Sequence, residues 1–307
     1  MSEADKPLLP PPLVLLVGIL AVSMASILIR LAQREASSLV IAAYRLSLAT
    51  LVVLPVALGR YRHEWAALPR RDMLGMFLAG VFLALHFVAW ITSLEYTTVA
   101  SSVVLVSLSP VFVALAAPIL LRETITARAG LGIAIALIGS GLVGLSDACA
   151  GLPLRCSLGG SGRMPLIGNA LALAGAVTVA GYFLIGRRVR GRLSLPTYIT
   201  TVYGTAAVVC LLIVAARGLP LVGYRPETYL WLTLVAMVPQ LIGHSSFNWA
   251  LRYLPTAVVT VTTLGEPIGS TILAYLLLGE APTALKLVGG GFILFGITLV
   301  AQERGGS

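Results

Sequence analysis

The sequence predicts an all-α membrane protein with ten transmembrane helices, arranged as two inverted five-helix repeats. Three observations support this fold class. Of the 307 residues, 58% are hydrophobic and only 11% are charged, apolar segments of spanning length recur along the chain, and the two halves share residues at a constant offset. A soluble domain of this length needs more polar surface to stay dispersed, so lipid is the expected solvent.

Apolar runs of about 20 residues, the length that crosses a bilayer as a helix, account for most of the chain. They lie near residues 12–31, 38–58, 73–93, 98–121, 127–146, 165–186, 196–216, 229–249, 256–278 and 284–301. The first run has a spanning length and no basic leader, so we expect a helix there rather than a cleaved signal peptide.

The formal net charge of +9 comes mostly from arginines in the gaps between these runs. This placement indicates membrane topology and headgroup contact, so no nucleic-acid partner is expected. More of the lysines and arginines lie on the side that holds both termini. The positive-inside bias therefore predicts an integral protein of the bacterial inner membrane with both termini in the cytoplasm.

An internal repeat relates the two halves of the chain. Residues 157 positions apart match at Pro110 and Pro267, Glu123 and Glu280, Gly132 and Gly289, and Gly139 and Gly296. We therefore expect a first repeat over 1–146, an external connecting loop over 147–164 and a second repeat over 165–307. Five helices per half make the second half enter the membrane from the opposite side, the arrangement of alternating-access transporters. A duplicated scaffold without transport is the alternative.

The three cysteines show no metal-ligand spacing, so neither a metal nor a cofactor is expected. Cys210 lies in an apolar run, whereas Cys149 and Cys156 both lie in the expected external loop. A disulfide between Cys149 and Cys156 is a hypothesis that depends on this topology, and whether the two are bonded stays open.

Charged side chains inside a span are costly, so each needs a partner or a function. Glu266 is expected about 16 Å into the ninth helix, directly before Pro267. It suits a proton or substrate-amine site, or else it holds the bundle together by pairing with Arg45. Arg45 itself either contacts lipid headgroups or binds a substrate carboxylate or phosphate.

Polar and aromatic residues mark a candidate cavity. Gln240, His244 and Asn248 follow at intervals of four, which places them on one face of an α-helix, and His86 and Trp90 share that spacing in the third run. Interhelical hydrogen bonding alone is the competing explanation. The aromatic candidates Tyr44 and Tyr182 complete the predicted cavity.

Small residues and prolines recur at equivalent places in the two halves. The glycine pairs Gly132 with Gly139 and Gly289 with Gly296 put small residues on one helix face, which favours close helix packing. Pro110 and Pro267 are predicted to act as gating hinges, because alternating access needs helices with two accessible shapes.

Two stretches resemble the paired signature of the EamA-type drug/metabolite transporters. They are SLEYTTVASSVVLVSLSPVFVALAAPILLRETIT and NWALRYLPTAVVTVTTLGEPIGSTILAYLLLGEAPT. The resemblance implies a ten-helix inverted repeat that exports amino acids, metabolites or toxic compounds without ATP hydrolysis. The first half reads Arg122-Glu123 where Gly-Glu is commoner in the family, which affects the expected turn.

Taken together, these features predict a secondary transporter that exports small metabolites such as amino acids. Whether protons are a second partner, coupled to this export, stays open. A phosphorylated-sugar or nucleotide-sugar exchanger and a non-transport sensor or scaffold are the alternatives. The sequence has no P-loop, HExxH or GxSxG motif, so an enzyme is not expected. Monomer and homodimer both remain open.

Overall fold

The computed structural model describes residues 9–120, 127–150, 155–156, 164–190, 193–250, 252–253 and 262–303. These residues are helical apart from short connections and one pair of two-residue strands. Seven helical segments within them are long and apolar enough to cross a membrane, and three shorter apolar helices cover Gly130–Val143, Gly265–Leu278 and Ala284–Leu299. The predicted all-α class is confirmed.

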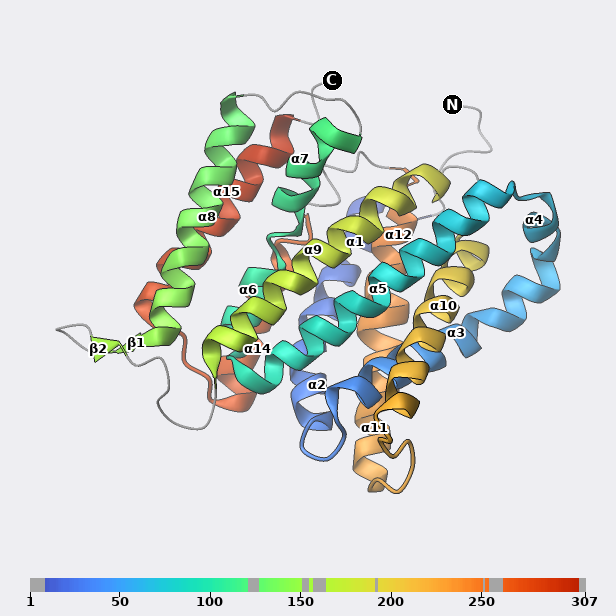
Figure 1. The fold of residues 1–307 in the computed structure, drawn as a ribbon, viewed down its shortest axis with the longest axis horizontal. Coiled ribbons are helices and arrows are strands. Elements are labelled where there is room, and N and C mark those ends of the chain that lie inside the picture. Colours follow the sequence, from blue (N-terminus) through green and yellow to red (C-terminus); the bar gives the residue numbers. More distant parts are fainter. Residues whose placement is uncertain are drawn as a thin grey trace.

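The described residues of the first half form eight helices, in the order shown in Figure 1. They are α1 (Pro11–Ser23), α2 (Ala25–Ala32), α3 (Ser38–Arg60), α4 (Arg62–Ala67), α5 (Arg70–Tyr96), α6 (Val99–Val106), α7 (Ser109–Leu120) and α8 (Ala127–Ala148). The turn at Arg122-Glu123 lies outside the described residues.

The second half follows a short antiparallel strand pair. The two strands are β1 (Cys149–Ala150) and β2 (Arg155–Cys156). The described helices of the second half are α9 (Pro165–Arg190), α10 (Leu195–Ala216), α11 (Pro226–Val235), η2 (Ala236–His244), α12 (Ser245–Ala250), α14 (Gly265–Leu278) and α15 (Ala284–Glu303). Most of the connecting loop over 147–164 lies outside the described residues.

The repeat is visible in how helices begin. The Ser37 hydroxyl caps α3 by accepting the Val40 N–H, and Ser194, 157 positions later, caps α10 by accepting the Thr197 N–H. Each cap satisfies a backbone donor that the first turn of a helix leaves unpaired. The same local signal therefore starts equivalent helices in both halves.

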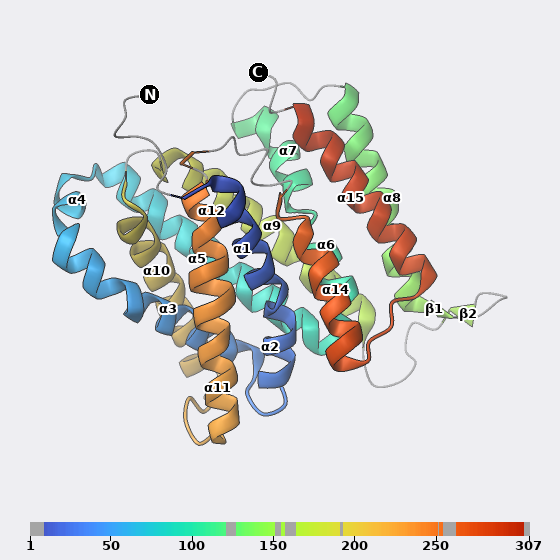
Figure 2. The same ribbon diagram turned by 180° about the vertical axis from the view of Figure 1, so that it is seen from behind.

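The two halves share one core. Helix α5 packs against α9 and α10, α3 packs against α10, α8 packs against α15, and α1 packs against η2 and α14. Figures 1 and 2 show α8 and α15 side by side from both directions, beside the bundle that contains α5, α9 and α10. Helices from one half thus bury their faces mainly against helices of the other.

The run expected over 98–121 is interrupted at residues 107–108, between α6 and α7. Pro110 is the second residue of α7, a position where its missing N–H costs no hydrogen bond. The proline therefore stands at the start of a new helix.

The run expected over 229–249 contains a π-helix, η2, instead of a continuous α-helix. Pro239 lies inside it and has no N–H to donate to the preceding turn. Hydrogen bonds in a π-helix join residues five apart, so the segment that carries Gln240 and His244 has a wider turn than the expected α-helix. Wider turns of this kind are frequent at functional sites.

Glu266 also differs from its expected position. Helix α14 begins at Gly265, so Glu266 lies in its first turn rather than about eleven residues into a continuous helix. Residues 254–261, which belong to the expected span over 256–278, lie outside the described part of the chain. A carboxylate is favoured at this end of a helix because the exposed N–H groups carry partial positive charge.

The expected glycine packing is confirmed where α8 meets α15. A Cβ atom added to Gly139 would lie 2.5 Å from the Gly289 carbonyl oxygen, and one added to Gly296 would lie 2.4 Å from the Gly132 carbonyl oxygen. Both distances are too short for any side chain. The close approach of the two helices therefore requires glycine at these positions.

Replacing Gly139 with Ala should lower Tm by several degrees, because the methyl group meets backbone and not a flexible side chain. Overpacking of this kind costs about 1–3 kcal/mol. Gly141→Ala is the matched control on the same helix, since a Cβ there meets nothing within 4 Å. Circular dichroism melts of purified protein would measure both, and equal Tm values would contradict the proposed contact.

Candidate functional site

The centre of the molecule holds a buried arginine. Arg45 of α3 is 0% exposed, and its Nε donates a hydrogen bond of 2.6 Å to the Gln240 Oε1 of η2. Because Nε–H is a donor, the Gln240 side chain must present its oxygen here. The bond joins the first half of the chain to the π-helix of the second half.

Aromatic rings surround the guanidinium group. Its Cζ atom lies 4.1 Å from the centroid of the Phe87 ring and 5.8 Å from that of the Trp90 ring, both on α5. Cation–π contact stabilises a desolvated cation by about 2 kcal/mol. Phe87 was not among the predicted site residues, because a phenylalanine in an apolar run is indistinguishable in the sequence from one that only packs.

Several polar atoms in this centre have no hydrogen-bond partner. Among them are Arg45 Nη1, Arg45 Nη2 and Trp90 Nε1. These three are N–H donors, and unpaired buried donors are costly. The centre is therefore rich in donors and short of acceptors.

A row of hydrogen bonds extends from this centre through the second half. The Tyr182 hydroxyl of α9 donates to Asn248 Oδ1 at 3.1 Å, and Asn248 Nδ2 donates to the Tyr203 hydroxyl of α10 at 3.4 Å. Tyr203 lies beside Gln240 and Ser245. The row links three helices to the residue that holds Arg45.

The two predicted histidines both contact the aromatic pair of Phe87 and Trp90. His86 Nδ1 is 2.9 Å from the Gly175 carbonyl oxygen of α9, and its ring is stacked with Trp90 at a centroid distance of 6.0 Å. Since a carbonyl only accepts, Nδ1 carries the proton. The His244 ring meets the edge of Phe87 at 5.6 Å.

Glu266 does not pair with Arg45. The two groups interact electrostatically, but the ion pairs found among the described residues do not include them. The structure therefore places the acid near the arginine without neutralising it through a direct contact.

Tyr44 lies apart from the other predicted residues. Its hydroxyl donates to the Leu221 carbonyl oxygen at 2.7 Å, and its ring is 6.2 Å from that of Tyr229. Neighbouring residues of a helix point about 100° apart, which explains why Arg45 faces the centre and Tyr44 does not.

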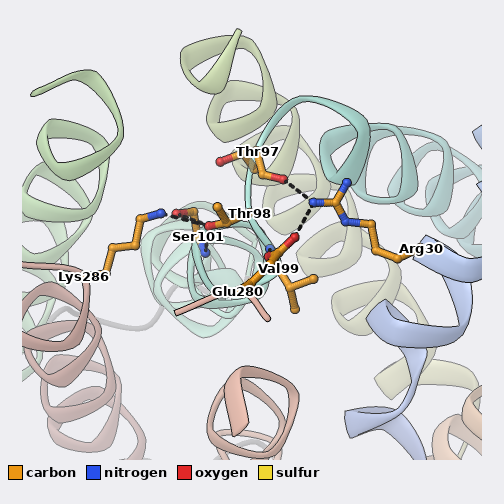
Figure 3. Close-up of polar contacts among 7 residues, drawn as sticks. All are labelled: Arg30, Thr97, Thr98, Val99, Ser101, Glu280 and Lys286. Carbon is orange, nitrogen blue, oxygen red and sulfur yellow. Dashed lines mark hydrogen bonds and ion pairs between the residues drawn. The ribbon is translucent and has the colours of Figure 1, made fainter. Parts of the chain in front are cut away.

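A second polar cluster closes one end of the bundle, and Figure 3 shows it. Arg30 at the end of α2 forms an ion pair of 2.7 Å with Glu280 Oε1, and Glu280 Oε2 accepts the Val99 N–H at 2.9 Å. Arg30 also donates to the Thr97 carbonyl oxygen at 3.3 Å. We call Arg30, Glu280 and the backbone of Thr97 and Val99 the clamp.

The clamp is continued by Lys286 of α15. Its Nζ donates to Thr98 Oγ1 at 3.0 Å, and the same hydroxyl caps α6 by accepting the Ser101 N–H. Glu280 was noted in the sequence only as the repeat partner of Glu123, which lies outside the described residues. Nothing in the sequence indicated that it meets Arg30, 250 positions away.

A mostly apolar cavity of about 270 Å³ lies between α6, α14 and α15. Ser101, Thr271 and Lys286 are its polar lining, and Pro267 and aliphatic side chains supply most of the rest. Pro267 thus borders an open volume. Within the described residues no group of three or more His, Cys, Asp and Glu side chains is placed to hold a metal ion.

Two repeats of apolar helices, joined at a buried polar centre, define a membrane transport protein. The chain belongs to the EamA-like transporter family, whose model matches residues 10–145 and 166–302. The family resemblance expected from the sequence is confirmed, and the protein is an integral membrane protein of this class.

Relatives agree with this assignment, and a solved structure shares the fold. Two proteins of Archaeoglobus fulgidus named "Uncharacterized transporter" are 26% and 24% identical over 90% and 92% of this chain and 93% and 94% of their own lengths. A similarly named protein of Clostridium kluyveri is 23% identical over 80% of this chain and 78% of its own length. One crystal structure superposes with a TM-score of 0.64 at 16% identity, over 96% of this chain and 97% of its own, which shows the fold alone.

Removing the Glu280 carboxylate should destabilise the protein, because Arg30 loses its ion-pair partner and the Val99 N–H loses its acceptor. The two side chains are 13% and 19% exposed, and hydrogen bonds to charged groups contribute about 1.5–3 kcal/mol each. We expect Glu280→Ala to lower Tm by several degrees in thermal melts.

Arg225→Ala is the control for this substitution. Arg225 lies 3.9 Å from Glu35 in an exposed pair, with 66% of its side chain accessible, and such pairs contribute little. If Glu280→Ala proved as mild as Arg225→Ala, the clamp would not be a stabilising contact.

Proposed function

We propose that this protein is a secondary transporter that exports small polar or amphipathic metabolites, such as amino acids, by alternating access. The observation that carries the proposal is the buried Arg45, held by Gln240 across the boundary between the two halves. A charge retained in a lipid-embedded bundle marks a substrate or ion pathway. Sites between repeats can be exposed to either side when the repeats move relative to each other.

The proposed topology has ten spans in two inverted repeats. Seven described helices are long enough to span the membrane, and in this topology the three shorter apolar helices also cross it, which gives ten spans. Figure 1 supports the inversion, since α8 ends beside β1 at one end of the molecule and α15 ends near the C-terminus at the other. The proposed divisions are 1–146, 147–164 and 165–307.

We place both termini in the cytoplasm of a bacterial cell. The positive-inside bias supports this orientation, and Figures 1 and 2 show the start of α1 and the end of α15 at the same end of the bundle. The clamp lies at the opposite end and therefore belongs to the external side.

The clamp and the interrupted helices fit a gating role. Arg30 and Glu280 tie α2 to the end of α14 and to the start of α6, so an outward path at that end opens only when these bonds break.

Pro110 and Pro267 stand in the first turns of α7 and α14, where the preceding chain can change direction without breaking helical hydrogen bonds. We assign them as hinges.

The proposed substrate site contains the residues that meet around Arg45. They are His86, Trp90, Tyr182, Gln240, His244 and Asn248, with Glu266 nearby as the proton-binding or amine-binding acid and with Tyr44 further out. Because these groups come from both halves, movement of one half changes the site.

Replacing Glu266 with Gln should abolish the dependence of transport on an imposed pH gradient in proteoliposomes, because the side chain no longer titrates. Exchange driven by the substrate gradient alone should persist. The exposed Glu227 in the first turn of α11 provides the control substitution Glu227→Gln. Unchanged pH dependence in Glu266→Gln would remove this residue from the coupling role.

We also propose that Cys149 and Cys156 form a disulfide in the external loop. The backbone register pairs Cys149 with Cys156 across the two strands, and directly opposed residues of an antiparallel pair have Cα atoms about 4.5–5.5 Å apart. A disulfide needs about 4.4–6.8 Å. The cell exterior would keep it oxidised.

Alkylation followed by mass spectrometry tests the bond. Without reductant, we expect only Cys210 to be modified in denatured protein, and with reductant all three cysteines. Three modifications under both conditions would show that the two loop thiols are free. Cys210→Ser isolates the loop pair.

A further inference from the structure

We infer that the donors around Arg45 form a carboxylate-binding site, so that the transported compounds are small organic monocarboxylates or zwitterions that bind through their carboxylate. The inference rests on the proposed function and names its substrate class. It starts from the chemistry of three unpartnered atoms, since Arg45 Nη1, Arg45 Nη2 and Trp90 Nε1 all donate and none accepts.

The free edge of the guanidinium group has the shape that a carboxylate fits. Arg45 Nε already donates a hydrogen bond of 2.6 Å to Gln240 Oε1. This bond fixes the plane of the guanidinium group and leaves the edge formed by Nη1 and Nη2 for a ligand. Two parallel N–H groups on such an edge bind both oxygens of a carboxylate. Gln240 is therefore a positioning residue, and the π-helix that carries it aims the arginine.

The aromatic rings restrict how a ligand approaches. The Phe87 ring covers one face of the guanidinium at 4.1 Å, so a ligand meets the edge and not that face. Trp90, whose ring is 5.8 Å from Arg45 Cζ, adds its unpaired Nε1 donor from the side. An anion at the edge thus satisfies donors from α3 and α5 together.

The charge balance favours one carboxylate over a phosphate dianion. Arg45 is the cation of this group, and Glu266 is a nearby acid that interacts with it electrostatically. A dianion next to a single arginine and an acid would remain largely uncompensated in a low-dielectric centre. A zwitterion remains compatible because its ammonium group can face Glu266.

The test compares matched compounds that differ only in charge at the carboxyl group. Propionate, 3-methylbutanoate, phenylacetate and L-phenylalanine would each be paired with the corresponding primary amide, which keeps the shape but removes the anion. Binding to the purified full chain is measured as a ligand-dependent rise in Tm, which follows from mass action. We expect at least one carboxylate to bind about tenfold or more tightly than its amide.

Variants assign this preference to the site. Arg45→Gln should abolish it, and Arg225→Gln, at the exposed arginine, should leave it unchanged. If Arg45→Gln does not fold, Trp90→Phe keeps the ring and removes one donor, and it should reduce the preference several-fold without loss of folding. Equal binding of acids and amides, absence of binding by both, or a preference that survives these substitutions would overturn the inference.

Transport measurements separate this inference from the proposed function. Counterflow in proteoliposomes would use the carboxylate that binds best and, in parallel, a panel of neutral and cationic metabolites. Carriage of the carboxylate supports both proposals. Carriage of only neutral or cationic compounds would sustain the transporter and overturn the carboxylate site, whereas carboxylate binding without carriage of any compound would sustain the site and count against transport.

Discussion

The hydrogen bond between Arg45 and Gln240 is the contact around which the centre of this protein is organised. A guanidinium group that is 0% exposed in a lipid-embedded bundle is tolerable only when nearby groups compensate its charge. Phe87 and Trp90 supply aromatic faces, and Gln240 supplies an oxygen from the other half of the chain. The halves are consequently joined by a polar contact as well as by their apolar faces.

The π-helix gives this contact its geometry. Pro239 prevents a regular α-helical ladder around η2, and the wider turn changes the direction of the side chains that follow. Gln240 meets Arg45, while Asn248, one turn or more beyond, joins Tyr182 and Tyr203. A local departure from ideal backbone thus connects the buried cation to a row of hydrogen bonds on three other helices.

The centre and the clamp are separate polar contacts that both join the halves. Glu280 lies in the second half, yet it satisfies Arg30 and the first free N–H of α6 in the first half. The glycine contacts between α8 and α15 are different, because they involve backbone against backbone and leave little freedom to slide. The glycine contacts thus suit a rigid pair of helices, α8 and α15. The clamp is a polar contact that can break, so that α2 and α6 can separate from the end of α14.

The sequence by itself determined the helical class, the family, the repeat and the glycine packing, because hydropathy and equivalent residues at a fixed offset are properties of the chain alone. It also identified Arg45, Gln240 and Trp90 as candidates, since polar groups in apolar runs are conspicuous. Only the tertiary structure decided that Arg45 meets Gln240 and Phe87, that Tyr44 points elsewhere, and that Arg30 meets Glu280. Contacts between residues so far apart depend on helix packing, and the start of α14 at Gly265 places Glu266 in the first turn of a helix, which the apolar run alone does not predict.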